Sequence, residues 1–168
     1  MGVTREMSGR GASEDLNRFP GASDSECQGE CDSNIFQVLI RVQHLRARIR
    51  DWTSYANRLD TGSGWIEEVL WALQGMETAA DAARLDAYAQ ICQHLAEKLP
   101  PLRYNPNPDS SFLQALGAWI GSSDRYLRRP GDPAAVADLV GRLNALPWDS
   151  PLSPKEQGIL FRALLQRA

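Results

Sequence analysis

The sequence predicts an all-α protein, an antiparallel helical bundle of about five to six helices that follows a disordered N-terminal tail. Apolar residues recur at alternating spacings of three and four along most of the chain, which is the pattern of helices with one buried face. Clusters of Pro and Gly divide the chain into segments of helical length. No segment combines an alternation of apolar and polar residues with β-branched enrichment, so the sequence predicts no strand. With 168 residues, 43% of them hydrophobic, the chain has the size and composition of one globular domain, which we place at residues 34–168.

The N-terminal residues 1–33 differ from the rest of the chain in composition. They are rich in Gly and Ser, and they carry seven acidic residues against three arginines. Their apolar residues are too sparse to follow a helix or strand period, which is typical of a disordered segment. The net negative charge of the protein, −3 in total, therefore comes from this tail.

The first predicted helix begins at Asn34, whose side chain can cap it, and ends at the Gly-containing turn of residues 60–64. Its apolar stripe has unbroken spacings of three and four and consists of Ile35, Val38, Val42, Leu45, Ile49, Trp52, Ala56 and Leu59. Its polar side carries two aspartates and the five arginines Arg41, Arg46, Arg48, Arg50 and Arg58. The helix is therefore locally cationic. An alternative arrangement pairs this long helix with its own copy in a homodimer.

Two further helices are predicted before the first proline-rich connection. The second runs from Trp65 to Ala80, and Gly75 weakens it by up to about 1 kcal/mol relative to Ala. The third continues to Leu99, where two prolines stop it. We interpret Cys92 on its inner face as a small buried hydrophobe. The inward residues expected for both helices are Ile66, Val69, Leu70, Leu73, Met76, Ala80, Leu85, Tyr88, Ile91, Cys92, Leu95 and Leu99.

The remaining residues predict three more helices. A fourth starts at Ser111, after the proline-rich connection of residues 100–110. Asp132 and Pro133 suit the cap and first position of a fifth helix, and the tetrad of residues 153–156 is a capping box for a sixth. Their apolar stripes are Phe112, Leu116, Trp119, Ile120, Tyr126, Leu127, Val136, Leu139, Val140, Leu143, Leu146, Ile159, Leu160, Ala163 and Leu164. Short turns between most helices favour antiparallel packing of neighbours.

Composition and missing motifs argue against several function classes. The slightly negative net charge gives no cationic field for nucleic acid, and no apolar run approaches the ~18 residues of a membrane span. Cys27 and Cys31 are separated by three residues and the chain has only two histidines, His44 and His94, so we expect that a four-ligand zinc site would need carboxylates or a second chain. The chain has no phosphate-binding glycine loop, nucleophile elbow or His-Glu-x-x-His motif. We therefore expect a cytoplasmic, non-enzymatic protein without metal or cofactor.

His44 and His94 are the candidate groups for phosphoryl chemistry near neutral pH. Each lies two residues after a position of the apolar stripe, so we expect both to point toward solvent. Phosphotransfer to a response-regulator aspartate needs such an accessible imidazole. An incidental surface histidine has the same appearance, and this interpretation stays open beside the first.

Residues 85–127 resemble the histidine-phosphotransfer (Hpt) and Hpt-like helical domains of bacterial chemosensory proteins. The stretches that carry the resemblance are residues 85–99, residues 112–120, and Tyr126-Leu127 before Pro130. Active members have Leu, Lys and Gly at the second, third and fourth positions after the phosphorylated histidine. Here Leu95, Ala96, Glu97 and Lys98 follow His94, and Leu45, Arg46, Ala47 and Arg48 follow His44. The resemblance therefore implies a degenerate module that keeps the bundle for binding and has lost phosphotransfer.

The sequence leaves two classes of function open. The first is a regulatory or adaptor protein that binds a partner protein through a helix face, and Trp71, which lies off the stripe of its helix, is its expected anchor. Arg46, Arg50 and Arg58 would complement an acidic partner surface. The second is an active phosphotransfer protein that uses His94. A secretion chaperone or an immunity-type binding protein would share the fold and differ in its partner.

Overall fold

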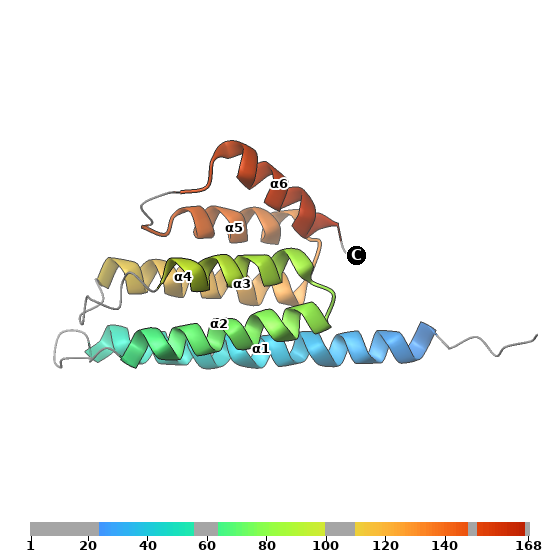
Figure 1. The fold of residues 1–168 in the computed structure, drawn as a ribbon, viewed down its shortest axis with the longest axis horizontal. Helices are drawn as coiled ribbons and strands as arrows, with labels where there is room; N and C mark the ends of the chain where they lie inside the picture. Colours follow the sequence, from blue (N-terminus) through green and yellow to red (C-terminus); the bar gives the residue numbers. More distant parts are fainter. Residues whose placement is uncertain (1–23, 56–63, 100–109, 148–150, 167–168) are drawn as a thin grey trace, which may run out of the picture.

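The structure, a computed structural model, describes residues 24–55, 64–99, 110–147 and 151–166. These residues form six helices and no strand, so the all-α prediction is confirmed (Figure 1). The helices are α1 (Asp24–Tyr55), α2 (Gly64–Ala82), α3 (Asp86–Lys98), α4 (Ser110–Arg128), α5 (Pro133–Asn144) and α6 (Pro154–Leu165).

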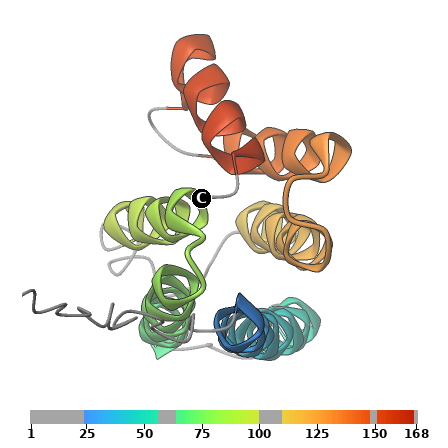
Figure 2. The ribbon, with the colours of Figure 1, turned by 90° about the vertical axis from the view of Figure 1, so that its right-hand side faces the viewer.

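The helices run up and down in sequence order, as the short connections predict (Figure 1). Seen end-on, α1, α2, α3 and α4 occupy four corners, and α5 and α6 lie over the side formed by α3 and α4 (Figure 2). α1 packs against α2 and α4, while α6 packs against α5 and α3. The backbones of α3 and α4 do not come into close contact, because the ring of Tyr88 lies between them. Tyr88 stacks on Trp119 and Tyr126 of α4, with ring centroids 6.5 Å and 5.7 Å away.

The core follows the predicted stripes. In α1 the stripe residues from Ile35 to Trp52 are all buried, and the stripes of α3, α4 and α5 are buried as well. In α2 only Leu70 of the expected set is partly exposed. Cys92 is fully buried, as predicted, and burial raises the pKa of its thiol. The turn into α3 places Arg84 at a φ of 57°, a left-handed conformation that ends α2 sharply.

The prediction that the first helix begins at Asn34 is wrong, since α1 begins at Asp24. The Asn34 side chain does not cap α1; its Nδ2 donates a hydrogen bond of 3.1 Å to the carbonyl oxygen of Ala82 at the end of α2. Figure 1 shows that α1 continues past this end of α2. The apolar stripe therefore starts where the packing begins, at Ile35, eleven residues after the first residue of the helix. Residues 1–23 of the expected tail lie outside the described residues.

The sixth helix begins where the sequence predicts, but few of its apolar side chains pack against the bundle. The capping box is present: the backbone nitrogen of Ser153 donates to Glu156 Oε2 over 2.8 Å, and the nitrogen of Glu156 donates to Ser153 Oγ over 3.3 Å. Of its apolar residues only Leu164 is buried, and Ile159 is 51% exposed. α6 is therefore a peripheral element. None of the described helices is both long and apolar enough to cross a membrane.

Candidate protein-binding surface

An exposed apolar patch lies where α1 meets α2 on the outside of the bundle. Four large apolar side chains of the described residues are exposed, and three of them, Phe36 (60%), Ile40 (47%) and Trp71 (65%), form this patch. Phe36 and Ile40 are one helical turn apart on α1, and Ile40 lines the same surface groove as Trp71 of α2. Trp71 lies between the buried Val69 and Leu73, which turns its side chain outward as predicted.

Arg41 holds the indole of Trp71 in place. Its guanidinium carbon lies 5.8 Å from the centre of the indole ring, within range of a cation–π interaction. The guanidinium also lies against Gly75, one turn after Trp71, and a Cβ at this position would force it to shift. Gly75 thus has a packing role beyond its cost to helix stability.

A bidentate ion pair closes the other end of the groove between α1 and α2. Arg48 donates to both carboxylate oxygens of Glu68, over 2.7 Å and 2.8 Å, and this bonding raises the pKa of Arg48. The guanidinium also lies over the Trp52 ring, 5.4 Å from its centre. Arg41 and Arg48 are therefore both occupied by partners within the chain.

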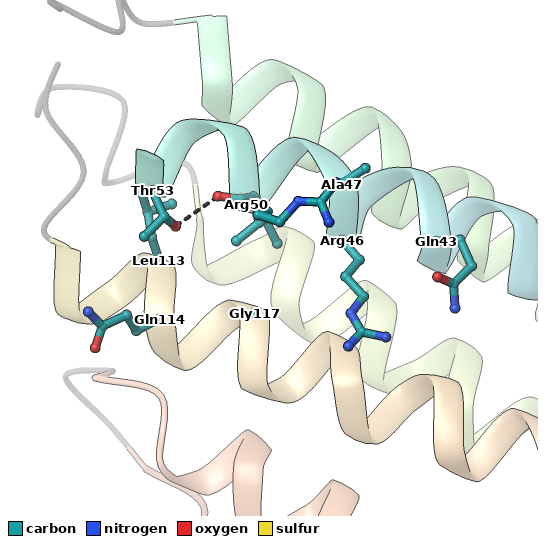
Figure 3. Close-up of a pocket in the computed structure, with 9 residues that line it drawn as sticks. Gln43, Arg46, Ala47, Arg50, Thr53, Leu113, Gln114 and Gly117 are labelled. Carbon is teal, nitrogen blue, oxygen red and sulfur yellow. Dashed lines mark hydrogen bonds between the residues drawn. The ribbon is translucent and has the colours of Figure 1, made fainter. Parts of the chain in front are cut away.

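A cationic cleft lies on the other flank of α1, between α1 and α4, with a volume of about 560 Å³ (Figure 3). Arg46 and Arg50 project along it from α1, beside Gln43 and opposite Gln114 and Gly117 of α4. No carboxylate lines the cleft, and no other described residue forms an ion pair with either arginine. The cleft therefore presents two positive charges that no carboxylate of the described residues neutralises.

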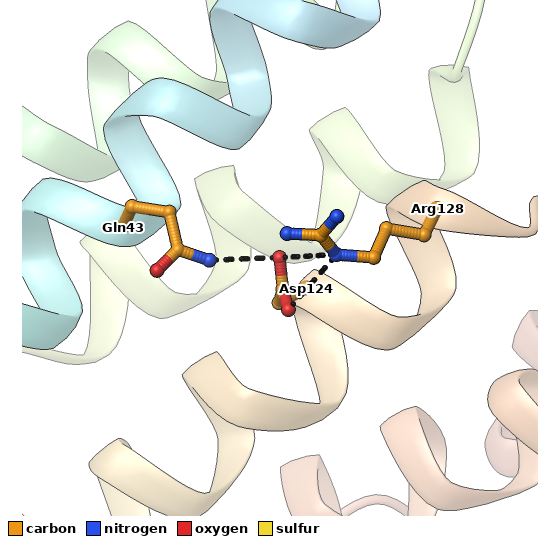
Figure 4. A network of polar contacts seen from close by, with 3 residues as sticks. All are labelled: Gln43, Asp124 and Arg128. Atoms are coloured by element: carbon orange, nitrogen blue, oxygen red, sulfur yellow. Dashed lines mark hydrogen bonds and ion pairs between the residues drawn. The ribbon is translucent and has the colours of Figure 1, made fainter.

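Beyond Arg46, the seam between α1 and α4 is tied by a polar network (Figure 4). Gln43 Nε2 donates to Asp124 Oδ1 over 2.8 Å, and Arg128 Nε donates to the same carboxylate over 3.1 Å. The hydrogen bond to Asp124 raises the pKa of Arg128. The network pairs the charges at this end of the seam, whereas Arg46 and Arg50 have no acidic partner in the part of the chain that the structure describes.

The predicted binding residues do not form one site. Trp71 lies over the seam of α1 with α2, whereas Arg46 and Arg50 lie over the seam with α4. Arg58 lies outside the described residues. Phe36 and Ile40 were not predicted, although both are large apolar residues off the stripe of their helix. Their position off the stripe could have indicated their exposure, because an apolar side chain there does not face the core.

The two histidines differ in their surroundings. His44 is exposed, as predicted, and lines the groove beside Trp71 and Glu68. His94 is half-buried in an apolar groove between α3 and α6, together with Glu156 and Ile159. The expectation of a solvent-facing His94 is thus wrong in part, because α6 packs against the face of α3 that carries it. The two hydrogen bonds from Ser153 lower the pKa of Glu156.

Within the described ranges, no three His, Cys, Asp or Glu side chains are close enough together to hold a metal ion. The side chains of Cys27 and Cys31 are outside what the structure describes. Comparison with known proteins gives no match to a family model, to a curated protein or to a solved structure. In the part of the chain that the structure describes, fold and surface together define a bundle of six helices with an exposed apolar patch on its longest helix.

Proposed function

We propose that this chain is a non-enzymatic adaptor or regulatory protein that binds a partner protein through the outer face of α1. One observation carries the proposal: Phe36, Ile40 and Trp71 are 47–65% exposed and lie together on α1 and α2, whose apolar stripes are otherwise buried except for Leu70, which is partly exposed. A gathered patch of this kind on a small domain is typical of a protein interaction site. Trp is the residue most enriched among the side chains that dominate binding energy.

The charges around the patch indicate the chemistry of the partner. Arg46 and Arg50 on the neighbouring flank of α1 have no acidic partner within the described residues. A polypeptide that covers the patch with apolar side chains and reaches this flank with carboxylates would complement both features. Rim charges of this kind affect partner choice and association rate more than affinity.

The surroundings of the histidines favour binding over phosphotransfer. His94 lies in a partly covered groove with the carboxylate of Glu156, which would repel an incoming phosphoryl group. A secretion chaperone or an immunity-type protein would use the same surface of α1 and differ only in the protein bound there. The Hpt-like resemblance remains a prediction of a degenerate binding module and adds no catalytic step to this proposal.

The test compares capture of host proteins by the immobilised full chain and by single variants. Trp71→Ala is expected to lose the partner that the unmodified chain retains. Ile159→Ala, which removes another exposed apolar side chain on the distant α6, is the matched control and is expected to retain it. Equal recovery of the same protein by both variants would remove the support for this face.

A further inference from the structure

We propose that the cleft between α1 and α4 is a binding site for a small phosphate monoester whose phosphate group lies between Arg46 and Arg50. This inference goes beyond the proposed function, since it concerns the α4 flank of α1 and does not depend on the apolar patch around Trp71. Three features of the cleft lead to it: the charge of its lining, the donors that its two arginines offer, and the apolar surface beside them.

The lining of the cleft is positively charged and has no compensating group among the described residues. No acidic side chain lines it. Asp124, the carboxylate farther along the same seam, is already bound by Gln43 and Arg128. Arg46 and Arg50 lie four residues apart on one helix, so their like charges repel each other. A bound anion would remove this repulsion and give both arginines a partner.

The other described arginines of α1 have partners within the chain. Arg41 lies over the indole of Trp71, and Arg48 forms a bidentate ion pair with Glu68. Both of these arginines lie on the α2 flank of the helix. Within the described part of α1, arginines without a partner are therefore confined to the α4 flank, where the cleft is.

Two arginines in one cleft suit a phosphate better than a carboxylate. A carboxylate has two oxygens, and one guanidinium can bind both of them through parallel N–H groups. A phosphate monoester has three terminal oxygens and a charge of about −1.5 to −2 at neutral pH, so it can accept hydrogen bonds from two guanidinium groups and balance their charges. Figure 3 shows Arg46 pointing toward α4 and Arg50 lying beside Ala47, with the amide of Gln114 on the opposite wall as a further donor.

The cleft is larger than a phosphate ion and is partly apolar. Its volume of about 560 Å³ is within the range of pockets that hold small molecules. Ala47, Ile49 and Leu113 supply apolar surface next to the two charges, and Gly117 adds no side chain to the α4 wall. Inorganic phosphate would leave this apolar surface uncovered. The expected ligand is therefore an ester that carries an apolar or aromatic group.

The first test titrates three probes into the full chain by isothermal calorimetry. Phenyl phosphate is expected to bind at one site, about tenfold more tightly than inorganic phosphate, because its ring covers apolar surface. Phenyl sulfate, which has the same ring and three terminal oxygens but a single negative charge, is expected to bind about tenfold more weakly than phenyl phosphate. A dissociation constant for phenyl phosphate above about 10 mM would overturn the site. Equal affinity for phenyl sulfate would overturn the assignment to phosphate.

The second test uses variants of the exposed arginines. Arg46→Ala/Arg50→Ala is expected to weaken the binding of phenyl phosphate about tenfold or more. Arg142→Ala/Arg162→Ala removes the same charge from α5 and α6, which do not pack against α1, and is the matched control that should keep the affinity. Arg46→Lys/Arg50→Lys keeps the charge but loses the bidentate donors, so an intermediate affinity is expected. Circular dichroism checks the fold of each variant. Equal weakening by the control would mean general attraction to a cationic surface and would overturn the site.

The outcomes separate this inference from the proposed function. Trp71→Ala is expected to bind phenyl phosphate as the unmodified chain does, because its side chain lies over the other seam of α1. A chain that binds none of the probes but captures a host protein in a Trp71-dependent way overturns the phosphate site and leaves the proposed function intact. Arginine-dependent binding of phenyl phosphate, together with capture that is indifferent to Trp71→Ala, would keep the site and remove the support for the proposed function.

Discussion

At the scale of single residues, the clearest coupling joins Arg41, Trp71 and Gly75. The guanidinium of Arg41, which lies over the indole, also occupies the space that a side chain at Gly75 would need. A glycine inside a helix ordinarily lowers stability by about 1 kcal/mol relative to Ala. At Gly75 this loss of helix stability is accompanied by a contact between Arg41 and the exposed Trp71. Such a contact restricts the orientation of the indole, as a binding anchor requires.

This coupling predicts a non-additive pair of substitutions. Gly75→Ala gains helix propensity but displaces the guanidinium of Arg41, so its net effect on the free energy of unfolding should be small. In an Arg41→Ala background the same substitution should give the full gain of about 1 kcal/mol. Urea denaturation of the four proteins would measure the interaction energy, expected at roughly 0.5–1 kcal/mol. An equal gain from Gly75→Ala in both backgrounds would show that the arginine is not held there.

A second prediction at this scale concerns His94 and His44. Incubation of the pure protein with a phosphorylated donor kinase or response-regulator mixture from its host should leave no acid-labile label on the chain. The physical reason is the carboxylate of Glu156 in the groove of His94 and the lack of the Lys and Gly positions after either histidine. His94→Ala and His44→Ala are the controls. Label that disappears in one of these variants would identify a phosphotransfer protein in spite of the degenerate motif.

At the scale of helices, apolar periodicity predicted packing more accurately than helix ends. The stripes of α3, α4 and α5 are buried as expected, because spacings of three and four place residues on one face wherever a helix has a neighbour. The start of α1 was missed for the same reason: its first turns extend past α2, so no apolar face marks them. In α6 the start was predicted correctly from its capping box, but the stripe could not show how little of that helix the bundle covers.

The capping box of α6 supports a prediction about local stability. Ser153→Ala removes the N-cap and one hydrogen bond to Glu156, at a cost of about 1 kcal/mol to the helix. Since α6 buries only Leu164 fully, this should speed amide hydrogen exchange in α6 about fivefold and leave α1 to α4 unchanged. Exchange measured by mass spectrometry resolves the two regions. A uniform change in all helices would show that α6 unfolds only together with the whole bundle.

The pH dependence of this cap has a defined sign. The hydrogen bonds from Ser153 lower the pKa of Glu156 in the folded state, so they stabilise α6 while the carboxylate is ionised. The contribution is complete above the ordinary glutamate pKa of about 4.3 and is lost as the pH falls through the lowered value. Protection of α6 should therefore decrease on acidification below about pH 4 in the unmodified chain, and less so in Ser153→Ala.

At the scale of the whole molecule, topology decides which predicted site residues can act together. The sequence placed Trp71 and the arginines of the first helix in one surface, because linear spacing shows which residues leave a stripe but not which neighbour lies on each side. The structure places α2 on one flank of α1 and α4 on the other, so Trp71 belongs to one seam and Arg46 and Arg50 to the other. The exposed outer face of α1 lies between these two seams, so it is the surface that connects Trp71 with the two arginines.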